Sequence, residues 1–192
     1  MHSEIHENTP QDPVWLGKQI RDLRKMRKLS LEDMQQLTGR SVGFLSQLER
    51  GKSQATVTDL SKIASVLNVP FSVFFSQAPA HERGVVVRQH QRPQLQYANG
   101  VTDELLSPGF DGGLQLMLTT FAPGASSGAQ PFEHGGDESG MVIKGQLELW
   151  IGDKCYLLSA GDSFSYASDQ PHRYCNPGST DTQVIWAYTV SN

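Results

Sequence analysis

The 192-residue sequence contains only two cysteines, Cys155 and Cys175, and lacks any long hydrophobic run. Two cysteines are too few for the disulfide framework of a small secreted protein. No stretch approaches the ~18–20 continuous apolar residues that a membrane span needs. Residues 1–13 are polar and acidic and lack the apolar core of a secretion signal. We therefore expect a cytoplasmic protein with no membrane partner and a disordered acidic tail over residues 1–13.

Positive charge is scarce in the chain as a whole and concentrated in its first third. The net charge is −4, yet residues 14–76 contain ten Lys or Arg and only five Asp or Glu. A basic segment on an acidic protein suits binding to a polyanion such as nucleic acid. A solvated helical face would carry the same charges. The motifs in the segment must therefore decide between these two interpretations.

The pattern of this basic segment predicts a small helical domain. Apolar residues recur at helical spacing across residues 15–75 and are interrupted by capping and turn signals. Ser30 and Asp33 have the spacing of a capping box, and a glycine is placed to end the same helix. The pattern predicts five short helices. The second and third lie at about residues 31–38 and 42–50, joined by the tight turn of a helix-turn-helix.

Residues 29–69 resemble the phage-repressor type of helix-turn-helix, the Cro/C1-like or XRE family. The resemblance extends over about residues 20–74 and implies a five-helix, lambda-repressor-like domain at residues 14–76 that binds double-stranded DNA. In this family the second helix of the motif lies in the major groove. The family hallmark S-x-L-E-x-G-K is present as Ser46, Leu48, Glu49, Gly51 and Lys52.

The resemblance also assigns the DNA contacts. Gln47 can make a bidentate contact with adenine, and Arg40 is the best remaining reader of guanine. Leu31 departs from the family, which often has a phosphate-contacting glutamine there, whereas Arg24 and Glu49 match positions that pair across the helices. The predicted DNA-binding residues are Arg40, Ser41, Val42, Gly43, Ser46, Gln47, Arg50 and Lys52.

The second half of the chain has the residue pattern of a β domain. After residues 77–84, which we interpret as a linker, short runs of Val, Leu, Thr and aromatic residues alternate with Gly and Asn. About eight short strands over residues 85–192 predict an antiparallel jelly-roll barrel, so the fold class is α + β in two domains. The predicted strands are Val85–Arg88, Leu114–Phe121, Met141–Ile143, Gln146–Ile151, Lys154–Leu158, Ser163–Tyr166, His172–Cys175 and Thr182–Thr189.

Two spacings in this half resemble the motifs of the cupin family. The first, within residues 132–145, keeps a His and a Glu of the family motif as His134 and Glu138, and the second, within residues 161–176, keeps its His as His172. A helix-turn-helix followed by a single cupin resembles the regulator group that includes the putrescine-utilisation repressor. The resemblance implies a DNA-binding transcription regulator, a repressor, whose DNA affinity is controlled by a small molecule in the cupin barrel.

The cupin motifs of this chain also depart from the family pattern. Phe132 stands at the position of the first metal-binding His, and Ala167 and Asp169 replace the usual proline and glycine of the second motif. His134, Glu138 and His172 remain as three ligands for a divalent metal such as zinc, iron or nickel. A metal-free pocket is the preferred alternative, and no cofactor is firmly predicted.

In a metal-free pocket, Glu138 would be a buried carboxylate that needs a protonated neighbour or a ligand ammonium. Aromatic side chains in the same cavity would add cation–π attraction. A polyamine or an amino-acid-like effector would fit such a pocket, and the resemblance implies the same. The candidate effector-binding residues are Phe132, His134, Glu138, His172, Tyr174, Trp186 and Tyr188.

A further expectation concerns catalytic activity. Many cupins are enzymes, so a dioxygenase- or isomerase-type metalloenzyme fused to a DNA-binding domain is one alternative, and a metal-responsive regulator is another. The missing metal ligand and the lack of a second acid–base group argue against an enzyme.

One helix-turn-helix is small for tight specific binding, so we expect a homodimer on a palindromic operator. We expect the effector signal to pass through the connector at residues 77–83.

Overall fold

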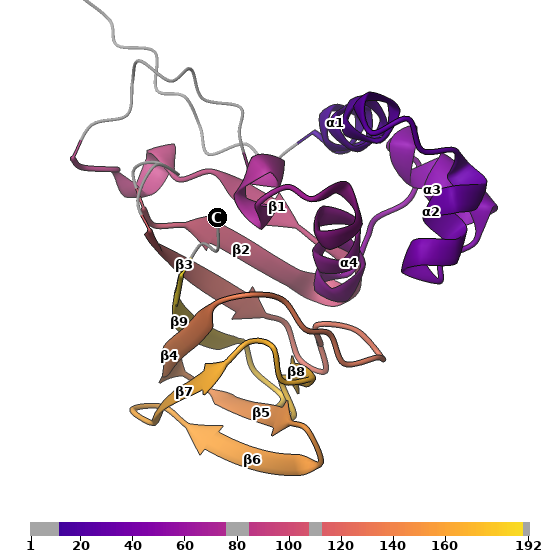
Figure 1. Cartoon of the computed structure of the whole chain (residues 1–192). Helices are drawn as coiled ribbons and strands as arrows, with labels where there is room; N and C mark the ends of the chain where they lie inside the picture. The colour runs from indigo at the N-terminus through magenta and orange to yellow at the C-terminus, as the bar shows by residue number, and fades with distance from the viewer. Residues whose placement is uncertain (1–11, 76–84, 108–112, 190–192) are drawn as a thin grey trace, which may run out of the picture.

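The computed structural model describes residues 12–75, 85–107 and 113–189, with the α-helices in the first range and the strands in the other two (Figure 1). The predicted linker at residues 77–84 and nearly all of the predicted tail lie outside the described residues. None of the helices in these ranges is both long enough and apolar enough to cross a membrane.

The helical part consists of four α-helices whose ends are fixed by local caps. They are α1 (Pro13–Met26), α2 (Leu31–Thr38), α3 (Val42–Glu49) and α4 (Val57–Leu67). The predicted capping box of Ser30 and Asp33 is present at the start of α2, and a second box, formed by Thr56 and Asp59, starts α4. Each box satisfies backbone N–H groups that a helix start leaves without partners.

The prediction of a fifth helix is wrong for the described residues. The segment Phe71–Phe75 forms a short 3-10 helix, η1, instead of an α-helix. The segment has only five residues. It can form too few i to i+4 hydrogen bonds to offset the conformational entropy that is lost when an α-helix is nucleated. Burial of Phe74 and Phe75 fixes its position instead.

Helices α1 and α3 pack closely because Gly17 and a buried ion pair join them. A side chain at Gly17 would overlap the backbone of Leu48 and Glu49. The Arg24 guanidinium forms a bidentate pair with the Glu49 carboxylate, with Nε–Oε1 and Nη2–Oε2 distances of 2.5 and 2.8 Å. The predicted pairing of Arg24 with Glu49 is therefore confirmed.

Within the described residues, nine strands form two antiparallel sheets. The larger sheet has the order β1-β2-β3-β9-β4-β7 and the smaller has the order β6-β5-β8. The strand bounds are β1 Gln94–Gln96, β2 Val101–Leu105, β3 Leu114–Phe121, β4 Asp137–Lys144, β5 Gln146–Ile151, β6 Lys154–Ser159, β7 Ser163–Ala167, β8 His172–Cys175 and β9 Thr182–Thr189.

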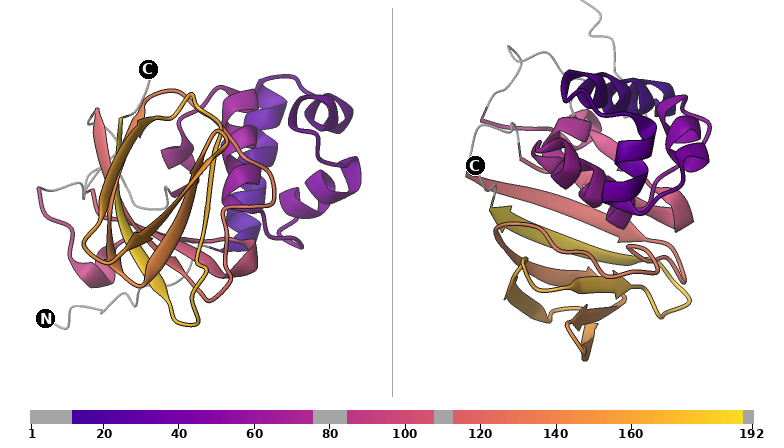
Figure 2. Two further views of the ribbon diagram at one scale, coloured as in Figure 1. Left: turned by 90° about the horizontal axis from the view of Figure 1, so that it is seen from below. Right: turned by 45° about the vertical axis from the view of Figure 1, so that its right-hand side comes forward.

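The two sheets face each other without closing into the predicted barrel (Figure 2). No ladder of the described residues joins an edge of one sheet to an edge of the other. The segments that contain Ser126 and Phe132 pair with β8 through isolated bridges only. Hydrogen bonding therefore stops at these points instead of continuing around a barrel, and the closed barrel is the incorrect part of the fold prediction.

Most predicted strands are present, but the start of the β part differs. Four of the predicted strands have the predicted bounds, which are those of β3, β5, β8 and β9. The predicted strand Val85–Arg88 is wrong, because these residues form a bend and an irregular segment in which Val85 is 95% exposed. Strands β1 and β2 were not predicted. They form a hairpin around Asn99 and Gly100, whose φ angles of 66° and 76° suit the tight turn that Asn-Gly favours.

The helical part packs directly against the β part. The backbone N–H of Ala98 donates to the Ala55 carbonyl, and both the N–H and the hydroxyl of Thr58 donate to the Ser127 carbonyl. Buried apolar side chains of both parts belong to one continuous cluster. Figure 1 shows α4 beside β1 and β2 as a result of these contacts. The helix behind the helix-turn-helix motif is thus also part of the wall of the β part.

Candidate functional site

A cavity of about 220 Å³ lies between the helical part and the β part. One wall comes from α4 and η1, and includes Val57, Ser61 and Phe71. The other wall comes from β2, β3, β4, β8 and β9 and the segment before β4. A ligand in this cavity would touch both parts of the chain. Ligand sites commonly occur at such domain interfaces.

The structure brings the predicted effector-binding residues together. Six of them line the cavity, and the seventh, His172, places Nε2 3.9 Å from Glu138 Oε1. The helical wall was not predicted, and neither were Asp103, Gln115, Met117 and Thr189 of the sheet wall. The six lining residues are Phe132, His134, Glu138, Tyr174, Trp186 and Tyr188.

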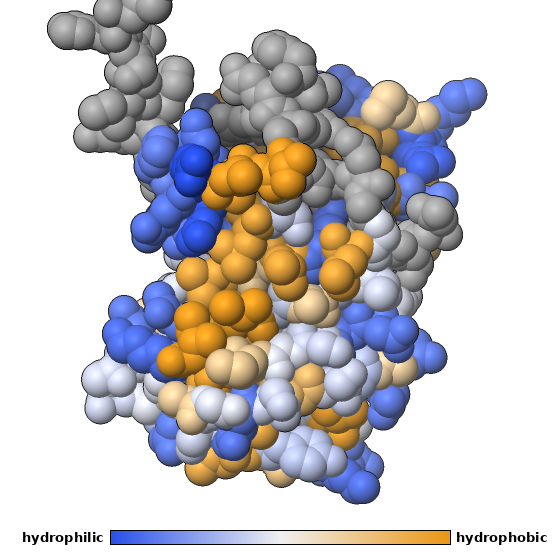
Figure 3. Space-filling model, turned by 90° about the vertical axis from the view of Figure 1, so that its left-hand side faces the viewer, coloured by the Kyte–Doolittle hydropathy of each residue, from blue (hydrophilic) through white to orange (hydrophobic). Residues whose placement is uncertain are grey.

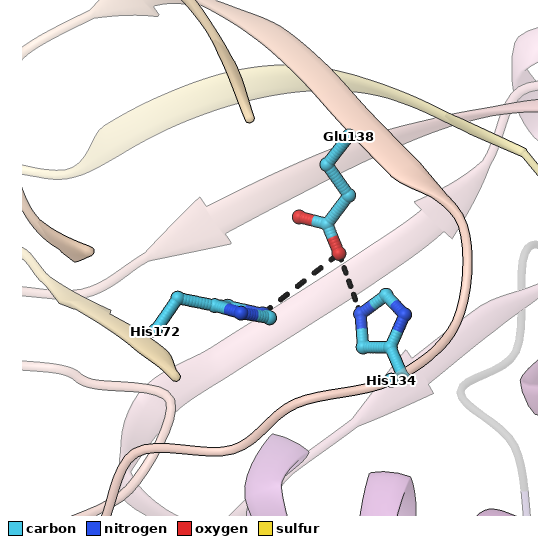
Figure 4. A group of neighbouring side chains, drawn as sticks. All are labelled: His134, Glu138 and His172. Atoms are coloured by element: carbon cyan, nitrogen blue, oxygen red, sulfur yellow. Dashed lines mark ion pairs between the residues drawn. The ribbon is translucent and has the colours of Figure 1, made fainter. Parts of the chain in front are cut away.

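Three of these residues form a compact cluster (Figure 4). His134 lies just before β4, Glu138 is the second residue of β4, and His172 begins β8. His134 Nε2 lies 2.6 Å from Glu138 Oε1, and one potential ligand atom from each residue lies within 4.8 Å of the others. The other carboxylate oxygen accepts a hydrogen bond of 2.5 Å from the Tyr166 hydroxyl.

His134 and Glu138 stabilise each other as an ion pair. Burial alone would lower the pKa of His134, but the hydrogen bond and the charge of Glu138 outweigh it and raise that pKa. Burial likewise opposes ionisation of Glu138, yet His134, His172 and Tyr166 together lower its pKa. His134 Nδ1 also contacts the Gly135 carbonyl at 3.1 Å. Both ring nitrogens then act as donors, which requires the protonated imidazolium.

His172 is neutral by contrast. Its Nδ1–H donates to the Gln170 carbonyl at 2.8 Å, so Nε2 keeps a lone pair, and burial lowers the pKa of the ring. The Nε2 atom is buried and has no hydrogen-bond partner among the described residues. The Phe132 ring lies 4.3 Å away, centroid to centroid.

The cluster also fits a divalent metal. In both histidines Nδ1 contacts a backbone carbonyl and Nε2 faces Glu138, which is how metal-binding histidines are usually oriented. A metal would have to replace the proton on His134 Nε2. Phe132 lies beside His172, stands at the motif position of the first metal-binding His and offers no ligand atom. His134, Glu138 and His172 are therefore the residues that could hold a metal.

Asp103 is a second carboxylate in the cavity. Its side chain extends inward from β2, is 1% exposed, and accepts hydrogen bonds from the Tyr97 and Thr119 hydroxyls at 2.6 and 2.5 Å. Burial raises the pKa of Asp103 to about 6 against the lowering effect of these hydrogen bonds. The Asn-Gly turn before β2 was the signal that could have identified this residue.

Two donors beside the cavity have no partner within the described part of the chain. They are the indole N–H of Trp186 and the amide nitrogen of Gln115, and both are buried. The amide oxygen of Gln115 accepts a hydrogen bond of 2.7 Å from the Tyr188 hydroxyl. Unsatisfied buried donors are uncommon in folded proteins, so these two groups are candidates for contact with a bound molecule.

The predicted DNA-binding residues lie at and around α3, the second helix of the motif. Ser41 caps this helix by accepting from the Phe44 N–H. Gln47 is exposed on it, whereas Arg40 forms an ion pair with Asp59 on α4. That ion pair connects the start of α3 to the helix that lines the cavity. Ser41, Gly43, Gln47, Arg50 and Lys52 are exposed, and Arg40, Val42 and Ser46 are half-buried.

Known proteins share both parts of this architecture. A helix-turn-helix family model matches residues 20–74, and a cupin domain model matches residues 117–188. The HTH-type transcriptional regulator SutR of Escherichia coli is 34% identical over 85% of this chain and 88% of its own length. The regulator PuuR of the same organism is 28% identical over 90% and 94%.

A solved structure supports the same arrangement of the chain. The crystal structure of an HTH_3 family transcriptional regulator from Vibrio cholerae superposes with a TM-score of 0.71 at 27% identity. The match covers 94% of this chain and 98% of that one. The likeness therefore extends over both the helical and the β part.

Proposed function

This chain belongs to the HTH-type transcriptional regulators that join a helix-turn-helix to a cupin domain, and we propose that it is a repressor controlled by a small amine-bearing effector. It is a DNA-binding transcription regulator, as its relatives are. The effector site is the cavity between the two parts of the chain. The observation that supports this role is that α4 forms one wall of the cavity and also holds Arg40 beside α3.

The effector signal passes through α4. A ligand that fits one placement of α4 better than another shifts the position of α3 relative to the cupin part. The coupling needs only about 1–3 kcal/mol, which corresponds to a roughly 5–150-fold change in DNA affinity. The difference in ligand contacts between the two states supplies this energy. This direct route replaces the connector at residues 77–83, which lies outside the described residues.

DNA is contacted by α3 in this proposal. Gln47 reads a base edge, whereas Arg50 and Lys52 contact phosphates that fix the register. Ser41, Val42, Gly43 and Ser46 complete the predicted surface. Arg40 is better suited to position α3, because Asp59 already engages its guanidinium.

Two copies of the chain bind a palindromic operator together. Apolar side chains gather on the outer face of the larger sheet, which Figure 3 shows from that side. Leu116, Met141 and Ile143 on this face are exposed, and the register places Met141 opposite Ile185. We assign this face to the dimer contact, because a monomer gains nothing from exposing such a patch.

The cupin part acts as a sensor rather than an enzyme in this proposal, because the relatives are named as transcriptional regulators. A metal-responsive regulator is the second candidate. The orientation of His134 and His172 toward Glu138 favours it. A divalent metal bound there would act as a Lewis acid and would hold these three side chains together.

The test is DNA binding at fixed salt, measured by fluorescence anisotropy on fragments from around the chain's own gene. Each fragment is titrated alone, with polyamines, with amino acids, with zinc and with a chelator. Specific binding that one amine compound weakens supports the proposal. Binding that changes only with zinc or chelator supports the metal-responsive candidate, and binding that no compound changes refutes both.

A further inference from the structure

Two carboxylates line the cavity, and the protein neutralises only one of them. Glu138 pairs with His134 at 2.6 Å. Asp103 has two hydroxyl donors, but no ion pair to it is formed by the residues that the structure describes. A buried carboxylate without a positive partner is costly. A cationic group of a ligand would supply that partner at the cavity wall.

Aromatic rings line the cavity in which such a cation would lie. Tyr174 and Tyr188 border it together with Asp103. Asp103 therefore shares the cavity with these rings. The negative faces of aromatic rings attract cations. An ammonium held by Asp103 would gain this second attraction.

The same cavity offers donors that need an acceptor. An indole N–H can only donate, and that of Trp186 is buried without a partner among the described residues. The amide nitrogen of Gln115 is in the same condition. Register places Gln115 opposite Tyr188 and Met117 opposite Trp186, so Gln115 and Trp186 are diagonal neighbours on adjacent strands. A second ammonium could not satisfy either donor, whereas a carboxylate could satisfy both.

We infer that the cavity binds a small zwitterion, an amino acid, whose ammonium pairs with Asp103 and whose carboxylate accepts hydrogen bonds from Trp186 and Gln115. The inference rests on the proposed role of the cavity as the effector site. Within that role it selects an amino-acid-like effector over a polyamine. It also assigns the ammonium to Asp103 and not to Glu138, which His134 already neutralises.

The experiment is a binding screen on the full chain with matched compounds. The probes are the twenty standard amino acids, 4-aminobutanoate and 5-aminopentanoate, first by thermal shift and then by calorimetry. Each zwitterion that binds is compared with the amine that lacks its carboxylate and the acid that lacks its ammonium. Butane-1,4-diamine serves as the polyamine probe. We expect at least one zwitterion to bind, with both truncated analogues at least tenfold weaker.

Variants assign the two ends of the ligand. Asp103→Asn should weaken zwitterion binding at least tenfold, and Trp186→Phe should weaken it severalfold. Glu104→Gln is the matched control, because it removes a carboxylate from the same strand on the opposite face and should leave binding unchanged. The comparison of ligand analogues needs no variant, so the inference stays testable if Asp103→Asn does not fold.

Three outcomes overturn the inference: no zwitterion of the panel binds, the diamine binds more tightly than every zwitterion, or Asp103→Asn binds the zwitterion as the wild type does. Failure of the proposed function would look different. A zwitterion that binds through Asp103 without changing DNA affinity supports the inference and refutes the sensor role. A diamine that changes DNA affinity while no zwitterion of the panel binds supports the sensor role and overturns the inference.

Discussion

Asp103→Asn should make the ligand-free protein more stable at neutral pH, even though it removes a binding group. Asp103 is 1% exposed, and its pKa is raised to about 6 from 3.8, mainly by burial. The folded state therefore prefers the neutral carboxyl, while the unfolded chain ionises it above about pH 4. Stability falls as the pH rises from 3.8 to 6, and the whole penalty remains at higher pH.

The magnitude follows from the shift of the pKa. About two units at 1.36 kcal/mol each give a penalty of about 3 kcal/mol above pH 6. Asparagine is neutral at every pH and avoids this penalty. Tyr97 and Thr119 donate to different oxygens of Asp103, and the amide keeps only one of these oxygens, so one hydroxyl loses its acceptor at a cost of about 1 kcal/mol. The net gain expected for Asp103→Asn at pH 7.5 is about 1–2 kcal/mol.

Urea denaturation of the ligand-free protein at pH 7.5 and pH 5 measures this gain, with Glu104→Gln as the control. The advantage of Asp103→Asn should shrink by about 1 kcal/mol or more at pH 5, because the wild-type penalty is smaller there. A variant that is less stable than the wild type at pH 7.5, or an advantage that does not depend on pH, would refute the reasoning. A stabilising change that abolishes ligand binding is the usual relation between stability and function at a binding site.

Three further predictions concern other parts of the chain. Arg24→Ala leaves Glu49 buried without its partner and should lower the free energy of unfolding by about 3 kcal/mol, measured with urea; a loss below about 1 kcal/mol would contradict this. Gln47→Ala should weaken binding to the operator by about 1–3 kcal/mol in an anisotropy titration, with an unchanged melting temperature, and equal affinity would refute the base contact. With chelator present, Glu138→Gln should cost most stability between about pH 5 and 6.5, because the charge on Glu138 is retained and His134 is still protonated there. The cost should fall as the pH rises through the raised pKa of His134, and a cost that grows in alkali would count against the ion pair.

The helical part was largely predictable because its signals are local. The capping box of Ser30 and Asp33 needs only three residues of separation, and the sequence displays it directly. The pairing of Arg24 with Glu49 came from the family resemblance, because their separation of 25 residues leaves no periodic trace. The last segment, Phe71–Phe75, was counted as the fifth helix because of its apolar residues and the family resemblance. A run of five residues does not determine helix type.

The cupin motifs identified the cluster of two histidines and one glutamate in the candidate site. His134, Glu138 and His172 were found because family spacing fixes which strand ends carry them, and the structure brings them together. Asp103 was missed because β1 has only three residues and β2 has three consecutive polar residues, Thr102 to Glu104, between its apolar ends. An acidic residue in a short segment suggests an exposed loop unless the hairpin around it is recognised.

The cavity itself was beyond a sequence argument. It depends on contacts between Ala55 and Ala98, and between Thr58 and Ser127, which are distant in the chain and involve backbone groups. Backbone hydrogen bonds of this kind leave no preference for particular side chains. The open arrangement of the two sheets depends equally on long-range packing.

The contact between α4 and Ser127 also bears on how regulators of this kind can exchange parts. A side chain at Gly128 would lie 2.8 Å from the Thr58 hydroxyl, so the surface that α4 meets is shaped for that helix. If two regulators exchanged whole domains at the connector after η1, α4 would be separated from the surface it fits. A chimera that takes its operator preference from another regulator should therefore graft α2 and α3 and retain the resident α4. DNA-reading helices and effector pockets can then diversify independently only while this one helix is inherited together with the pocket.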